Sequence, residues 1–211
     1  MSTLIECLRS FNSKERFFLV GEMLGKPKFQ PSPEFLKKLY DALNLAILQP
    51  PVFCAMDYHL DWIYASLKLA GDRQDGPVYL NSEGKIKAQQ EDVDFLIAGD
   101  ADDLCHMILI EAKGVTGWSN RQMTSKAKRL CGIFGDDANE RSGVRPHFVI
   151  MSQCERGKLD QSGWPKWMTA GIGKVSWVRL PVPEKLKRVA RCDGNATEDR
   201  NGRYWKVEDR G

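Results

Sequence analysis

Glu111 and Lys113 lie at the end of a strongly apolar run, HMILIEAKG, which spans residues 106 to 114. The residues from Met107 to Ile110 predict a buried strand, and buried strands rarely admit charged side chains. In a pleated strand, residues two positions apart point to the same face, so Glu111 and Lys113 are expected to share one. A neutralised ion pair at the edge of a sheet would explain both residues without any chemistry. Two charges on one face of an apolar strand are nevertheless costly unless something requires them, so the pair indicates a reactive or binding site.

A second acidic residue, Asp94, lies in the preceding segment, DVDFLIAG, which also predicts a strand. If the two strands pair as a hairpin through residues 99 to 104, Asp94 comes beside Glu111. Two carboxylates and the carbonyl oxygen of Ala112 are the ligands that a hard divalent cation prefers. Such an ion can polarise a phosphoryl oxygen and activate water, while the Lys113 ammonium stabilises the developing charge. The pattern therefore predicts hydrolysis of phosphodiester bonds.

The elements that must position these residues change in type along the chain. Helices are predicted for residues 12–24, 32–43, 55–70 and 119–134, the third from a stripe formed by Met56, Leu60, Ile63, Leu67 and Ala70. Strands are predicted for residues 77–80, 85–90, 92–99, 106–114, 146–153 and 174–182, followed by a hairpin around residues 195–202. The helix that begins after Ser119 or Asn120 is expected to be a crossover between parallel strands.

The predicted fold class is α/β, a mixed sheet flanked by helices in a single domain of residues 1–211. Residues 1–50 are expected to form a helical extension and residues 51–155 the core. Residues 156–211 are expected to add the C-terminal strands and the hairpin.

Asp94, sixteen intervening residues and then Glu111-Ala112-Lys113 resemble the PD-(D/E)XK nuclease superfamily, which has the restriction-endonuclease-like fold. The resemblance covers residues 55 to 153 and includes the order helix, strands, helix, strand; Val93 stands where the motif has proline. It implies that Asp94 and Glu111 hold Mg²⁺, with Mn²⁺ as a substitute, and that Lys113 assists the attacking water. The implied partner is nucleic acid, with DNA the commoner substrate of the family.

Members of this family often take a further acidic ligand from the helix before the sheet, where Asp57 and Asp61 lie one turn apart. The helix dipole explains Asp57 at the start of this predicted helix without any catalytic role. Asp61 lies deeper, where aspartate has poor helix propensity, so it is the better candidate for the metal.

Gln122 and Lys126 are one turn apart in the helix after the motif, and related nucleases place a glutamine or a lysine there. The resemblance implies that both contact phosphate or the water held by the metal. A solvated helix face explains Lys126 as well as contact with phosphate does, and it explains Arg129, one turn further on, better than such contact. Trp118, in the loop GVTGWSN, is a candidate for stacking on an unpaired base, although packing within the loop is the commoner role.

Composition narrows the remaining classes of function. No apolar run approaches the roughly 20 residues that a membrane helix needs, and the charged first residues are not a secretory signal. The six cysteines form no CxxC pair, which favours reduced thiols in a cytoplasmic protein. The net charge of +3 is only weak support for a nucleic-acid partner.

Three functions are compatible with these observations. The first is a metal-dependent nuclease, favoured by the intact set of two acids and a lysine. The second is a nucleic-acid-binding or scaffold protein that keeps the fold without turnover. The third is a hydrolase of another phosphate substrate, although the sequence has no phosphate-binding loop. A homodimer suits the cutting of both strands of a duplex, but no coiled coil or exposed apolar stripe indicates one.

Overall fold

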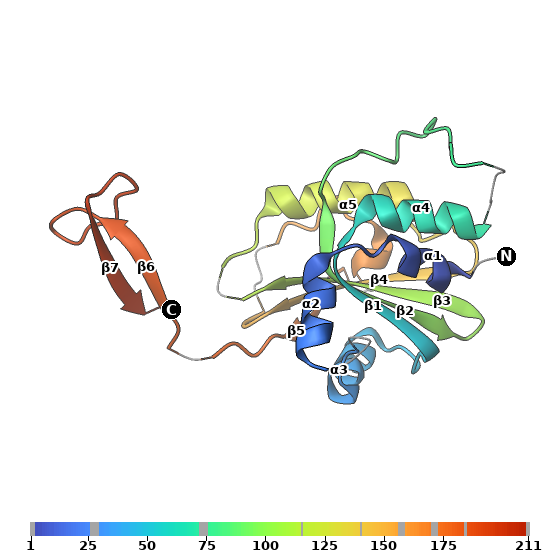
Figure 1. Cartoon of the computed structure of the whole chain (residues 1–211), viewed down its shortest axis with the longest axis horizontal. Coiled ribbons are helices and arrows are strands. Elements are labelled where there is room, and N and C mark those ends of the chain that lie inside the picture. The colour runs from blue at the N-terminus through green and yellow to red at the C-terminus, as the bar shows by residue number, and fades with distance from the viewer. Residues whose placement is uncertain are drawn as a thin grey trace.

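A five-stranded mixed sheet organises the body of the molecule (Figure 1). The computed structural model describes residues 3–25, 30–71, 76–114, 116–139, 141–155, 159–169, 173–183 and 185–209. In spatial order the strands are β1 (Gln49–His59), β2 (Asp92–Ala101), β3 (Leu104–Lys113), β4 (Val144–Ser152) and β5 (Ser176–Arg179). The pairs β1–β2 and β2–β3 are antiparallel, and β3–β4 and β4–β5 are parallel. The predicted α/β class is confirmed.

Helices cover both faces of this sheet (Figure 1). The helices α1 (Leu4–Phe11), α4 (Leu60–Gly71) and α5 (Asn120–Phe134) pack on one face, where a short 3-10 helix, η1 (Lys166–Thr169), also contributes to the core. The helix α3 (Pro33–Leu43), which follows α2 (Glu15–Met23), packs on the other face. N-terminal residues therefore contribute to both cores: Leu8 to the first and Leu39 to the second. None of the helices in the described ranges is long and apolar enough to cross a membrane.

The helix predicted from Ala55 to Ala70 is wrong in its first five residues, which belong to β1. The helical period holds from Leu60 onward. The cause of the error lies in the position of β1 between two layers of helices. Cys54 contributes to one core and Ala55 to the other, so the strand is apolar on both faces and shows no alternation.

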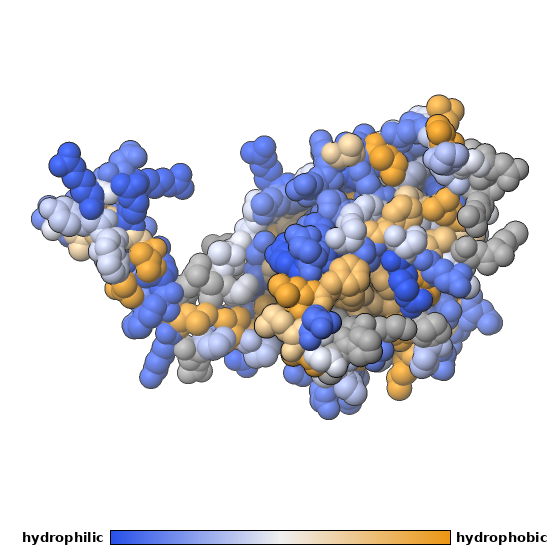
Figure 2. Space-filling view, viewed as in Figure 1, coloured by the Kyte–Doolittle hydropathy of each residue, from blue (hydrophilic) through white to orange (hydrophobic). Residues whose placement is uncertain are grey.

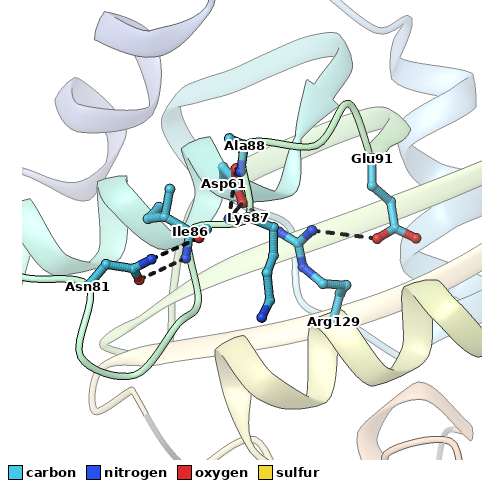
Figure 3. A network of polar contacts seen from close by, with 7 residues as sticks. All are labelled: Asp61, Asn81, Ile86, Lys87, Ala88, Glu91 and Arg129. Carbon is cyan, nitrogen blue, oxygen red and sulfur yellow. Dashed lines mark hydrogen bonds and ion pairs between the residues drawn. The ribbon is translucent and has the colours of Figure 1, made fainter.

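The described residues 76–91 contain no strand, although extended pieces are predicted at 77–80 and 85–90. The predicted turn from Asn81 to Gly84 is confirmed, because the Gly84 backbone nitrogen donates to the Asn81 carbonyl oxygen at 3.0 Å. The Asn81 side chain also bonds both backbone polar groups of Ile86, at 2.9 and 3.2 Å (Figure 3). Hydrogen bonds with side chains, in place of a strand ladder, therefore satisfy backbone polar groups of this loop.

The two connections on which the site depends agree with their predictions. β2 and β3 form an antiparallel hairpin, and its turn is only Asp102–Asp103, with φ of 50° and 62°. A two-residue turn with positive φ at both positions matches the twist of the flanking strands. The helix α5 begins after Ser119, whose side chain accepts a hydrogen bond from Gln122, and links β3 to its parallel neighbour β4.

The predicted C-terminal hairpin is also confirmed, with strands β6 (Lys187–Cys192) and β7 (Tyr204–Asp209). It stands apart from the body of the molecule (Figure 1). Among the described residues, neither core includes a side chain beyond Leu180. The body and the hairpin therefore bury apolar surface separately.

Candidate active site

A pocket of about 500 Å³ opens where β2 begins and β3 ends. Its walls come from these two strands, the first turns of α5 and the loop that precedes β2. The candidate residues that line it are Asp94, Glu111, Lys113, Trp118, Gln122 and Lys126. The fold thus brings residues from two strands, a loop and a helix to one cavity.

Asp94 is tied to the backbone of β3. The ladder pairs Phe95 with Ile110, so the next position outward brings Asp94 to Glu111, as the predicted hairpin requires. Asp94 Oδ2 accepts a 2.6 Å hydrogen bond from the backbone nitrogen of Ala112. This nitrogen belongs to the residue between Glu111 and Lys113, so the three charged groups are held together by main-chain geometry.

Glu111 is buried, with 4% of its surface exposed, and Lys126 Nζ contacts its Oε1. Burial raises the pKa of Glu111 to about 7, although the Lys126 ammonium acts in the opposite direction. The nearby Asp94 carboxylate raises this pKa further. Lys126 is buried too, so the solvated-face interpretation is wrong for this residue. A buried acid that titrates near neutral pH is typical of functional sites.

Lys113 and Trp118 lie next to each other at the C-terminal end of β3. Lys113 Nζ is 6.0 Å from the centroid of the Trp118 ring, which is a cation–π distance. The ring also packs partly against the main core, and its Nε1 is buried without a hydrogen-bond partner among the described residues. Trp118 is therefore largely buried beside Lys113, which leaves little of its surface for stacking on a base.

Several lining residues escape sequence reasoning, among them Glu91, Asp92 and Arg121. Asp92 could have been predicted as a lining residue, because it lies two positions before Asp94 on the same strand and so shares its face. Arg121 and Glu91 carried none, since the phase of α5 and the course of the loop follow from tertiary contacts. With them, the pocket has four carboxylates and three basic side chains.

Asp61 does not line the pocket but fixes the loop that does (Figure 3). Its carboxylate accepts hydrogen bonds from the backbone nitrogens of Lys87, at 3.1 Å, and Ala88, at 2.8 Å. It also pairs with Arg129 Nη2 at 2.5 Å, and Arg129 lies 3.7 Å from Glu91. The Arg129 side chain is largely buried in this network, so a solvated face is wrong for it as well.

Asp57 is also outside the pocket. It belongs to β1, has a φ of 49°, and pairs with Arg16 at 2.9 Å, so the first helical turn predicted for it is wrong. Of the two upstream acids suggested by the resemblance, one is thus engaged with the loop and the other with α2. Neither carboxylate reaches Asp94 and Glu111.

The donor set at the pocket fits a hard cation that retains water. Among the described residues there is no group of three His, Cys, Asp or Glu side chains that could hold a metal ion. Mg²⁺ tolerates such a set, because it is commonly bound by one or two carboxylates and keeps several waters. Asp94 Oδ1 and Glu111 Oε2 receive no hydrogen bond from the described part of the chain, so both are available as ligands.

Comparisons with known proteins do not assign a family, because no family model, no curated protein and no solved structure matches this chain.

Proposed function

We propose that this protein is a divalent-metal-dependent nuclease of restriction-endonuclease-like fold that hydrolyses phosphodiester bonds, with DNA as the expected substrate. One observation carries the proposal. Asp94, Glu111 and Lys113 line a single pocket, and Asp94 is bonded to the backbone between the other two. The order β2, β3, α5, β4 is also the strands–helix–strand order that the resemblance implies.

In this proposal Asp94 and Glu111 hold Mg²⁺ or Mn²⁺. The bound ion would supply Lewis-acid stabilisation of the phosphoryl group and a more acidic water. Lys113, on the same strand, would stabilise the negative charge that develops on the phosphoryl oxygens. The positive end of the α5 dipole and Arg121 face the same pocket, which favours the binding of a phosphate group there.

Lys126 has a separate role in the proposed site. Its ammonium forms an ion pair with Glu111, which makes burial of this carboxylate less costly. Because Lys126 lines the pocket, its ammonium would also be available to a phosphate oxygen of the substrate when Glu111 holds a divalent cation.

A nucleic-acid-binding protein without turnover is the second candidate. It is favoured by the ion pair between Glu111 and Lys126, which neutralises the buried acid without any metal ion. The basic side chains of the pocket would then bind a phosphate without cleaving it.

Cleavage assays separate the two candidates. Labelled single-stranded, duplex and branched DNA, and RNA, would be incubated with Mg²⁺ or Mn²⁺ and with wild type, Asp94→Asn or Lys113→Ala. Loss of these charged groups is expected to slow cleavage by about 10²- to 10³-fold or more. Asp57→Asn is the matched control, since this acid lies outside the pocket and should leave cleavage unchanged.

Metal-dependent cutting that disappears in both pocket variants would support the nuclease. If wild type cuts none of these substrates but still binds them, the nuclease proposal is wrong and the binding protein takes its place.

A further inference from the structure

One face of the C-terminal hairpin combines apolar and aromatic side chains with a basic one. The ladder pairs Val189 with Val207 and Arg191 with Trp205, and side chains alternate along each strand, so these four residues share a face. The exposed fractions are 69% for Val189, 68% for Trp205 and 54% for Val207. We call this surface the Trp205 face.

No element of the described body covers the Trp205 face. The hairpin is separate from the five-stranded sheet in Figure 1, and Figure 2 shows hydrophobic residues on its surface beside hydrophilic ones. An isolated two-stranded hairpin is only marginally stable in water. The exposed side chains of Val189, Trp205 and Val207 are therefore accessible to a ligand.

The end of the hairpin holds Arg191 in place beside Trp205. Arg191 Nε and Nη2 donate to the Gly202 carbonyl oxygen at 3.0 and 2.7 Å. Gly202 is itself tightly packed, since an added Cβ would lie 2.1 Å from the Cys192 carbonyl oxygen. The guanidinium group is thus oriented by the backbone and needs no carboxylate to fix it.

The hairpin also has basic groups that form no ion pair with an acidic side chain among the described residues. Each of its carboxylates is engaged: Glu198, Glu208 and Asp209 pair with basic side chains, and Asp193 and Asp199 accept backbone N–H groups in turns. The basic side chains with no acidic partner among the described residues are Lys185, Arg191, Arg200 and Arg203. The hairpin therefore combines an exposed indole ring with free positive charge.

We propose that the Trp205 face binds a single-stranded segment of nucleic acid, with an unpaired base stacked on Trp205 and phosphates contacting Arg191 and the other free basic residues. Aromatic rings beside basic residues bind unpaired strands in this manner. The choice of ligand rests on the proposed nuclease function. β3 ends and α5 begins on the side of the body that faces the hairpin, so a strand bound there lies on the same side as the pocket (Figure 1).

A second copy of this chain is a weaker candidate for the occupant. Strands of six residues are about 20 Å long, and a two-stranded ribbon is about 10 Å wide. The face therefore presents roughly 200 Å², far below the roughly 800 Å² that each partner buries in a stable interface. Protein–protein contact through this face alone would be too small to hold a dimer.

Binding measurements in EDTA test the proposal without interference from cleavage. The probes are fluorescently labelled single-stranded and duplex oligonucleotides, and the readout is anisotropy at low salt. Trp205→Ala is expected to weaken single-strand binding by about 5- to 100-fold, because one stacked base is lost. Trp205→Tyr retains an aromatic surface and should bind nearly as well as wild type.

Tyr204→Ala is the matched control. This tyrosine is an exposed aromatic residue on the same strand, but it pairs with Cys192 on the opposite face. Its variant should bind as wild type does. Equal binding by wild type and Trp205→Ala would overturn the proposal, as would loss of a dimer in Trp205→Ala with unchanged binding.

Cleavage with Mg²⁺ on the same proteins separates this proposal from the proposed function. If wild type cuts, and Trp205→Ala binds and cuts equally well, only the role of the hairpin is wrong. If wild type does not cut, and Trp205→Ala still loses single-strand binding, the hairpin role holds and the nuclease proposal fails.

Discussion

Replacing Lys126 by methionine is expected to make the stability of the fold depend on pH in a new way. Lys126 and Glu111 form an ion pair whose side chains have only 11% and 6% of their surface exposed. Methionine retains an unbranched apolar side chain but removes the positive charge. Glu111 is then a buried acid with the Asp94 carboxylate nearby and no partner of opposite charge in contact.

The pKa of Glu111 determines the size of the effect. In wild type it is raised from 4.5 to about 7, so the resulting stabilisation is fully present below pH 4.5 and is lost as the pH rises through 7. That loss amounts to about 3 kcal/mol and ends when Glu111 ionises. Without Lys126 the pKa of Glu111 lies higher still, so the loss continues at about 1.4 kcal/mol per pH unit.

The variant should therefore match wild type near pH 6 and have a free energy of unfolding lower by about 3 kcal/mol at pH 9. Urea denaturation, followed by tryptophan fluorescence in EDTA at several pH values between 5.5 and 9, measures this difference. Lys128→Met is the control, because Lys128 is exposed on the same helix and should show no such dependence.

A difference between wild type and Lys126→Met that stays constant across this pH range would refute the reasoning, because it would show that packing, and not charge, explains the effect. Repeating the titration with Mg²⁺ extends the test to the proposed site. If Asp94 and Glu111 hold the ion, Mg²⁺ should stabilise the variant at pH 8 to 9, since ligand binding to the folded state adds stability.

Asp61→Asn should weaken the attachment of the loop before β2, so trypsin should cut after Lys87 faster than in wild type. Equal cleavage rates in Asp61→Asn and in the control Asp57→Asn would contradict this role of Asp61. Burial lowers the pKa of His147 from 6.5 to about 4, so the folded state favours the neutral ring. The stability that the neutral ring contributes is fully present above pH 6.5, and the free energy of unfolding falls by about 3 kcal/mol as the pH drops toward 4. His147→Gln should remove that loss, and parallel urea profiles for the two proteins would argue against it. Gly202→Ala should open the hairpin, which would be measured as faster hydrogen exchange in β6 and β7 with an unchanged urea midpoint for the body. Unchanged exchange would show that the hairpin accommodates the added methyl group.

Local sequence signals were sufficient to predict the hairpin of β2 and β3, the start of α5 and the approach of Asp94 to Glu111. The apolar runs of β2 and β3, the short polar turn between them and the Ser119 cap of α5 are each readable within about ten residues. Because antiparallel pairing across a tight turn sets the register, the approach of Asp94 to Glu111 followed from the same signals.

Only the tertiary structure decided the remaining features, because they depend on contacts between distant segments. The boundary between β1 and α4 was hidden, since burial on both faces removes the alternation that identifies a strand. Asp61 carries the same carboxylate as Asp94, yet contact with residues 87 and 88 makes it a support for the pocket wall. Burial likewise made Lys126 the partner of Glu111 in place of a surface lysine. Trp205 is exposed because no element in the described ranges covers it. The sequence by itself determined which groups could do chemistry, and packing decided which of them meet.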